Sequence, residues 1–117
     1  MFKKKVPIYE QIKSIIIDNI LSGVWKEGDK IPSIRNFALE FGVNPNTIMN
    51  ALKDLQQKKI LENKRGIGNI VCDGVVEKIL RDKKEKFCNE KLNEVIKEAK
   101  ILKINLNELK DEIESKW

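Results

Sequence analysis

Short polar side chains stand at the start of one amphipathic stretch, where they are well placed to hold a phosphate group. In the string NPNTIMNALKDL, residues 44–55, Asn44 is suited to cap a helix and Pro45 to occupy its first position. Apolar residues then recur at three- and four-residue steps, so we expect one helix face to be buried. Asn46 and Thr47 remain at the polar end, where free backbone N–H groups and the helix dipole favour an anion.

Residue types that usually carry out catalysis are scarce. The sequence contains no histidine, and neither Cys72 nor Cys88 has a nearby partner at metal-ligand spacing. It also contains no Gly-x-Ser-x-Gly or phosphate-loop pattern. We therefore predict that the protein is not an enzyme and needs neither a cofactor nor a metal. The two cysteines fit reduced thiols, and we find no secretion signal or membrane-length apolar run, so we expect a cytoplasmic protein.

Positive charge is concentrated in the first part of the chain. Residues 1–72 contain 12 Lys and Arg and 7 Asp and Glu, and residues 73–117 contain 11 of each kind. The first part therefore supplies the whole net charge of +5. This distribution is expected if the first part meets a polyanion. Lys3, Lys4 and Lys5 would supply most of the excess even as a solvated tail, so charge alone is weak evidence.

Three amphipathic helices are expected in this first part. One covers residues 8–21. A short second helix follows the natural cap Ser33 and ends at Gly42, and a third runs from the Asn44 cap to about Lys58. Only FGVN separates the second helix from the third, which is the spacing of a helix-turn-helix.

The period of the apolar residues changes after the third helix. Ile60 and Leu61 lead into a strand, KRGIGN supplies two glycines for a tight turn, and Ile70 and Val71 lead out. These residues predict a β-hairpin with a basic, glycine-rich tip. A helix-turn-helix followed directly by such a hairpin is a winged helix.

The rest of the sequence has the pattern of two helices. The helical period returns at Val75 and lasts to about Lys103. Asn105 is expected to break this run, because asparagine tolerates the left-handed conformation, and Asn107 is expected to cap a last short helix.

The predicted fold is therefore mainly α (α+β), with a winged helix-turn-helix over residues 1–72 and a two-helix tail over 73–117. Amphipathic helices of this length need another surface to cover their apolar stripes, either the winged domain or a second copy of the chain. The apolar residues expected to pair two chains are Phe87, Leu92, Val95, Ile96, Leu109, Ile113 and Trp117.

Five linked motifs run through residues 7–71: PIYEQI, SGxWxxGDKIPSIR, FGVNPNTI, ALxxLxxKxIL and RGxGxxV. In this order and at this spacing they strongly resemble the DNA-binding domain of GntR-family bacterial transcription regulators. The resemblance implies a sequence-specific regulator whose partner is double-stranded DNA.

The short tail narrows the resemblance. Many GntR regulators carry a large ligand-binding or aminotransferase-like domain there, whereas residues 72–117 hold only helices. This is similar to the YtrA subfamily, whose short helical tails serve dimerisation. The resemblance implies a homodimeric repressor, of a kind that often controls operons encoding ABC transporters, with a roughly palindromic operator.

Carried over position by position, the resemblance implies which residues contact DNA. They come from the start of the second helix, the start of the third helix and the hairpin tip. The expected contact residues are Ser33, Arg35, Asn44, Asn46, Thr47, Asn50, Lys64, Arg65, Gly66 and Gly68.

The third helix departs from the family at two positions. Where the family usually has Arg or Lys, this sequence has Met49 and Asn50. Asn50 can pair bidentately with adenine, and Met49 can meet a thymine methyl group. We therefore expect an A·T-rich operator, with more of the specificity carried by Arg35 and by DNA shape.

Two other classes of protein stay open at this point. One is an effector-sensing regulator with a ligand site between tail and winged domain, although no cluster of polar residues in the tail indicates which effector it would bind. The other is a winged helix that binds protein instead of DNA, against which the positive first part, Arg35 and the basic hairpin tip argue.

Overall fold

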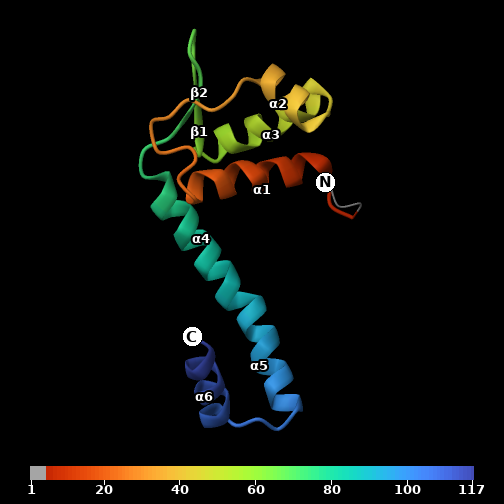
Figure 1. The fold of residues 1–117 in the computed structure, drawn as a ribbon, viewed down its shortest axis with the longest axis vertical. Helices are drawn as coiled ribbons and strands as arrows, with labels where there is room; N and C mark the ends of the chain where they lie inside the picture. Colours follow the sequence, from red (N-terminus) through yellow and green to blue (C-terminus); the bar gives the residue numbers. More distant parts are fainter. Residues whose placement is uncertain (1–4) are drawn as a thin grey trace. The chain divides into compact units, whose positions relative to one another are not determined.

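The computed structural model describes residues 5–117, so Lys3 and Lys4 of the basic N-terminal run lie outside the described residues. The chain forms two compact units, one ending at Leu80 and the other running from Arg81 to Trp117. The first unit holds three helices and a hairpin, and the second is helical (Figure 1). None of the helices within residues 5–117 is long and apolar enough to cross a membrane.

The first unit has the element order of a winged helix. Three helices precede a two-stranded antiparallel sheet, in which Leu61 pairs with Val71 and Lys64 with Gly68. The bounds confirm the predicted winged helix-turn-helix. They are α1 (Ile8–Leu21), α2 (Ile34–Phe41), α3 (Pro45–Gln57), β1 (Leu61–Lys64) and β2 (Gly68–Val71).

Helix α3 lies at the centre of this unit and contacts α1, α2 and β1. Its apolar face is formed by Ile48, Ala51, Leu52 and Leu55, each no more than 1% exposed. Fully burying a side chain the size of leucine or isoleucine stabilises a fold by about 1.5–3 kcal/mol. The apolar spacing that predicted the helix therefore also fixes which face of α3 turns away from the core.

The turn between α2 and α3 is set by local hydrogen bonds. The Ser33 hydroxyl oxygen accepts a bond from the Asn36 N–H at 3.1 Å and caps α2. Gly42 ends α2 with a φ of 64°, a left-handed conformation that glycine adopts without a Cβ penalty. Asn44 Oδ1 then accepts the Asn46 N–H at 2.8 Å and starts α3. All three capping roles were predicted.

The loop before α2 forms hydrogen bonds along the free edge of β2. The Gly28 N–H donates to the Val71 carbonyl at 2.8 Å, and the Ile31 N–H donates to the Asn69 carbonyl at 3.0 Å. The Val71 N–H donates in turn to the Asp29 carbonyl at 2.9 Å. Because β2 is bonded on both sides, the hairpin is tied to the body of the unit at its base.

The start of α4 (Val75–Asn89) belongs to the first unit. Val75 and Ile79 are 2% and 5% exposed within its core. The compact unit thus extends past residue 72, the predicted domain boundary, because the first turns of α4 complete its core.

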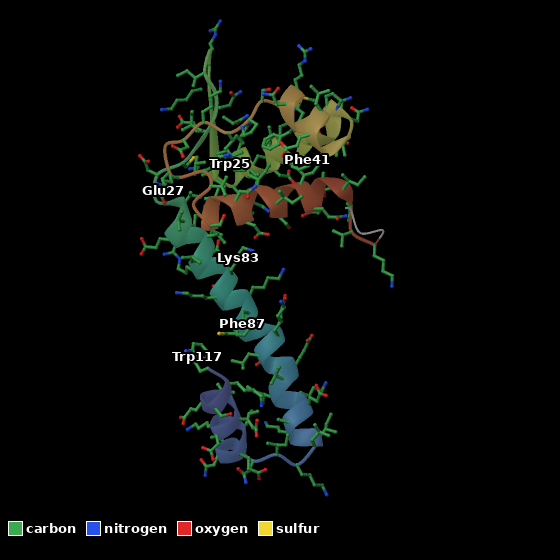
Figure 2. The ribbon with its side chains drawn as sticks, in the orientation of Figure 1. Trp25, Glu27, Phe41, Lys83, Phe87 and Trp117 are labelled. Carbon is green, nitrogen blue, oxygen red and sulfur yellow. The ribbon has the colours of Figure 1, made fainter. Side chains whose placement is uncertain are left out.

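Polar contacts also hold the start of α4. The Glu27 carboxylate accepts the Gly74 N–H at 2.8 Å and the Val76 N–H at 3.0 Å (Figure 2). These two bonds, the one from Gly74 first, lower the pKa of Glu27 below its ordinary value. Lys78 Nζ donates to the Lys58 carbonyl at the end of α3, at 2.8 Å.

The expected long helix over residues 75–103 is divided in two. Helix α4 ends at Asn89 and α5 (Lys91–Ile101) begins after Glu90, whose φ and ψ are −112° and −77°. The single-helix prediction was wrong at this point, and no residue type here marks the break, since neither glycine nor proline is present.

The link before α6 (Leu106–Lys116) also differs from the prediction. Lys103, not Asn105, takes the left-handed conformation, with a φ of 60°. The Ile104 N–H donates to the Ala99 carbonyl at 2.9 Å and closes the end of α5. Asn105, not Asn107, caps α6: its Oδ1 accepts the Glu108 N–H at 2.9 Å and its amide donates to the Glu108 carboxylate. Asn105 is extended because capping requires that conformation.

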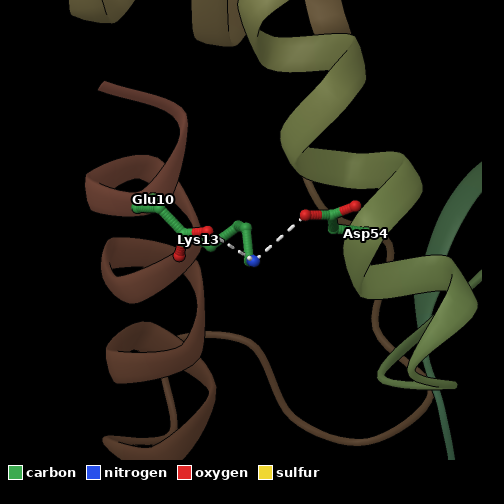
Figure 3. A network of polar contacts seen from close by, with 3 residues as sticks. All are labelled: Glu10, Lys13 and Asp54. Atoms are coloured by element: carbon green, nitrogen blue, oxygen red, sulfur yellow. Dashed lines mark hydrogen bonds and ion pairs between the residues drawn. The ribbon is translucent and has the colours of Figure 1, made fainter. Parts of the chain in front are cut away.

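A buried lysine joins α1 to α3. Lys13 is 6% exposed, and its Nζ lies 3.1 Å from Asp54 Oδ2 on α3 and 3.3 Å from Glu10 Oε1 on α1 (Figure 3). Burial lowers the pKa of an ammonium group, but the hydrogen bonds to Asp54 and Glu10 and the attraction of both carboxylates outweigh it. The pKa of Lys13 is raised as a result.

Lys13 is the buried member of this network, whereas its carboxylate partners are partly exposed. Removing a carboxylate and removing the lysine should therefore change the unfolding free energy by different amounts. Asp54→Ala leaves the Lys13 ammonium buried with Glu10 alone, and we expect a loss of roughly 1–3 kcal/mol of unfolding free energy. Lys13→Met keeps the packing and leaves two carboxylates that water can reach, so its cost should be about 1 kcal/mol or less. Urea unfolding at neutral pH measures both. A Lys13→Met loss larger than that of Asp54→Ala would contradict this account.

The same lysine gives the fold a dependence on alkaline pH. Because the pKa of Lys13 is raised in the folded state, its contribution is complete below the unfolded pKa of about 10.4 and is lost as pH rises through the folded value. The unmodified protein should therefore lose more stability above about pH 10 than Lys13→Met does. Equal losses in the two proteins would place the alkaline sensitivity elsewhere.

Candidate nucleic-acid interface

The N-terminal turn of α2 presents one capping residue and one free cation. Ser33 uses its hydroxyl oxygen as the helix cap, as described above, but the hydroxyl proton is still available to donate. Arg35 is exposed on the first turn. Its five N–H donors form a planar fork that matches a phosphate or a guanine edge.

The start of α3 is polar and largely open to solvent. Asn46 and Asn50 are exposed and Thr47 is half-buried. The Asn44 side-chain oxygen is occupied by its cap bond, so this residue first serves the helix. The remaining side chains and the helix N-terminus together offer hydrogen-bond donors without a full positive charge.

The hairpin, which we call the wing, has a three-residue tip between Lys64 and Gly68. The Ile67 N–H donates to the Lys64 carbonyl at 3.0 Å and closes the turn. Arg65 and Lys64 are exposed, which places two cations at the tip. Gly66 has a φ of 79° and Gly68 one of 118°, values at which a residue with a side chain would be strained.

A cleft of about 490 Å³ separates the wing from α2 and α3. Three cations lie along it: Lys30 from the loop before α2, Arg35 from α2 and Lys53 from α3. Of the residues predicted to contact DNA, Ser33, Arg35 and Gly68 line this cleft. The others lie outside its walls, at the start of α3 and at the wing tip: Asn44, Asn46, Thr47, Asn50, Lys64, Arg65 and Gly66.

Some of the cleft-lining residues were not predicted as contacts. Lys30 stands in the GDKIP motif, and its Cε would lie 3.3 Å from a Cβ added at Gly68. Asn63 and Ile67 belong to the wing itself. Asn63 and Ile67 lie close to the predicted turn, so the hairpin prediction could have indicated both of them as wing residues. The position of Lys30 beside the wing depends on the tertiary fold, which the sequence pattern does not show.

A direct hydrogen bond fixes the wing against α3. Gln56 Nε2 donates to Asn69 Oδ1 at 2.7 Å, in a partly buried position. The Asn69 carbonyl is held from the other side by the Ile31 N–H. The wing and α3 are therefore joined at a defined spacing, which a rigid DNA duplex would require of two elements that contact it together.

The part of the chain that the structure describes holds no cluster of metal-binding side chains. Within residues 5–117, no three His, Cys, Asp or Glu side chains are grouped to hold a metal ion. Both cysteines are free. Burial, with the nearby Glu62 and Asp73 carboxylates, raises the pKa of the Cys72 thiol and so disfavours the reactive thiolate.

The residues predicted to pair two chains all lie in the tail and are poorly covered. Phe87, Val95 and Ile113 are 53%, 49% and 46% exposed, and Trp117 is fully exposed. The other three, Leu92, Ile96 and Leu109, are half-buried. Among the residues of the second unit, Ala99 alone is buried.

A helix-turn-helix and a wing, with a cationic cleft between them, are the parts of a winged-helix domain of the kind that binds DNA. Residues 8–71 match the family described as bacterial regulatory proteins, gntR family. The chain therefore belongs to the GntR family, as its five motifs predicted. This family consists of transcription regulators, which agrees with the prediction that the protein is not an enzyme.

Individual relatives extend the likeness into the tail. The chain is 33% identical to the HTH-type transcriptional repressor YtrA of Bacillus subtilis over 92% of its own length and 82% of that protein, in line with the predicted YtrA subfamily. A GntR-family regulator of known structure from Bacteroides thetaiotaomicron is 34% identical, with a TM-score of 0.81 over 92% of this chain and 94% of that one. The DNA-binding domain of AraR in complex with operator ORR3 is 30% identical, with a TM-score of 0.57 over 62% of this chain and 87% of that one.

The Gln56–Asn69 bond should limit motion of the wing. Gln56→Ala removes a bond worth about 1 kcal/mol, so amide hydrogen exchange at residues 64–69 should quicken roughly fivefold. Gln57→Ala, an exposed neighbour on the same helix, is the matched control and should leave wing exchange unchanged. Equal exchange in both variants would mean that the backbone bonds alone hold the wing.

Proposed function

We propose that the protein is a homodimeric repressor that binds a roughly palindromic operator through the cleft and the polar end of α3. The observation that carries the proposal is the cleft itself, whose three cations stand between the two elements that would follow a DNA strand. The likeness to the AraR domain, which is solved bound to an operator, supports the same use of this surface.

The side chains divide into phosphate contacts and base contacts. Lys64 and Arg65 at the wing tip, with Lys30 and Lys53 along the cleft, would hold phosphates. Ser33 would add a hydroxyl donor, and the wing glycines at 66 and 68 would let the backbone approach the edge of the minor groove.

Sequence would be read from α3 and from Arg35. Asn50 is exposed in the second turn of α3 and would pair with adenine, while Asn46 and Thr47 in the first turn would contact phosphate or base edges. Met49 lines the cleft and would meet a thymine methyl group. The asparagine at position 50 and the methionine at position 49 favour A·T pairs, and Arg35 would supply the strongest single contact.

The tail would join two copies of the chain. A helical region in which only Ala99 is buried leaves its apolar stripe in water, and a second copy is the partner that a symmetric operator needs. Half-sites should then lie about one helical turn (~10 bp) apart, or a multiple of it. The repressor role and a transporter-type operon follow the YtrA resemblance, and the relative YtrA is itself named a repressor.

Arg35 should carry base or phosphate recognition. On a duplex selected from a random pool with the full chain, Arg35→Ala should weaken binding by about 1–3 kcal/mol if the arginine reads a base. Arg81→Ala removes an exposed arginine from α4 and serves as the control. Fluorescence anisotropy at two salt concentrations measures both. Unchanged affinity in Arg35→Ala would remove this residue from the interface, and a pool that yields no consensus would count against sequence-specific binding.

The tail stripe should control assembly. Val95→Lys places a charge in the half-exposed apolar stripe of α5 and should weaken the dimer at least about tenfold, because the ammonium would be buried without a partner. Asn93→Lys adds the same charge at an exposed position of the same helix and should leave the dimer intact. Sedimentation velocity over a dilution series distinguishes them. A monomeric unmodified protein, or equal effects of the two variants, would refute pairing through this stripe.

A further inference from the structure

Ile67 is an apolar side chain at the tip of an otherwise polar wing. Within KRGIGN, residues 64–69, it is the sole apolar residue, and it is 53% exposed. Its N–H is bonded to the Lys64 carbonyl, so the turn fixes the backbone that carries this side chain. Exposing a large apolar group costs hydration free energy, which is recovered when another surface covers it.

The surroundings of Ile67 indicate what that surface is. Ile67 lines the cleft that also contains Lys30, Arg35 and Lys53, and it stands between the two left-handed glycines of the tip. A partner that meets these cations and the isoleucine together must carry anions beside an apolar surface. A nucleic-acid backbone does so, because each phosphate is followed by a deoxyribose whose ring carbons are apolar.

We propose that Ile67 packs against deoxyribose rings at the wall of the minor groove and supplies a part of the binding energy that salt does not screen. The proposal rests on the proposed binding of DNA by the wing. Lys64 and Arg65 would hold the flanking phosphates, and Ile67 would exclude water from the sugars between them. Apolar side chains such as isoleucine are known to enter the minor groove in other DNA-binding proteins.

Salt separates this contact from the electrostatic ones. Phosphate contacts release counterions, so each one lost reduces the slope of log affinity against log salt by about one unit. An apolar contact releases water and no ions, so its loss should lower affinity by the same factor at every salt concentration.

The test compares Ile67→Ala with Arg65→Ala on the pool-selected duplex, with full-length protein at four salt concentrations. We expect Ile67→Ala to lose about tenfold in affinity with an unchanged salt slope. Arg65→Ala should flatten the slope instead. Val24→Ala, which removes apolar atoms from a residue 60% exposed outside the cleft, is the matched control and should bind as the unmodified protein does.

Two further measurements complete the test. Ile67→Leu keeps the apolar contact and should keep most of the affinity, and hydroxyl-radical footprints should lose sugar protection at the wing in Ile67→Ala alone. An Ile67→Ala loss that disappears at high salt, or no loss at all, would overturn the proposal. So would a change of oligomeric state in Ile67→Ala without DNA, because it would show that the isoleucine meets a second protein surface.

A sugar contact does not require a particular base sequence. If the pool yields no consensus, the proposed sequence-specific function fails, but the same comparison on a generic A·T-rich duplex still decides the role of Ile67. The two failures are therefore distinguishable.

Discussion

The winged unit depends on the burial of one face of α3. Ile48, Ala51, Leu52 and Leu55 are almost wholly removed from water by α1, α2 and β1. Because this face is fixed inward, the polar start of the helix must face outward, and the same rotation sets Met49 and Lys53 on the cleft wall. A one-residue slip of α3 would bury polar side chains and expose the core, so the interface is specified by the same apolar pattern as the fold.

Local rules were sufficient wherever a residue acts through its own backbone. Ser33 and Asn44 cap α2 and α3 with their side chains, and Gly42 ends α2 in the left-handed conformation. The apolar pairs on either side of KRGIGN, with its two glycines, indicated the hairpin. The motifs of residues 7–71 gave the family. These features involve neighbours within a few residues, which a single sequence displays directly.

Predictions failed where two local choices were both acceptable. Asparagine suits a left-handed turn and a helix cap about equally, and Asn105 caps while Lys103 takes the strained turn, because the cap also satisfies Glu108. Contacts between distant segments were not visible at all. The Gln56–Asn69 bond and the Glu27 carboxylate at the start of α4 join residues whose spacing in sequence gives no period or motif. Contact with DNA by individual residues likewise depends on the partner and stays a prediction.

The two units differ in how much of their apolar surface each one buries by itself. The first unit buries a continuous core that includes Val75 and Ile79 of α4, and Glu27 and Lys78 add polar bonds at the same helix end. The second unit leaves most of its apolar side chains in water. On the proposed dimer, tail stability would rise with protein concentration by mass action, whereas that of the winged unit would not.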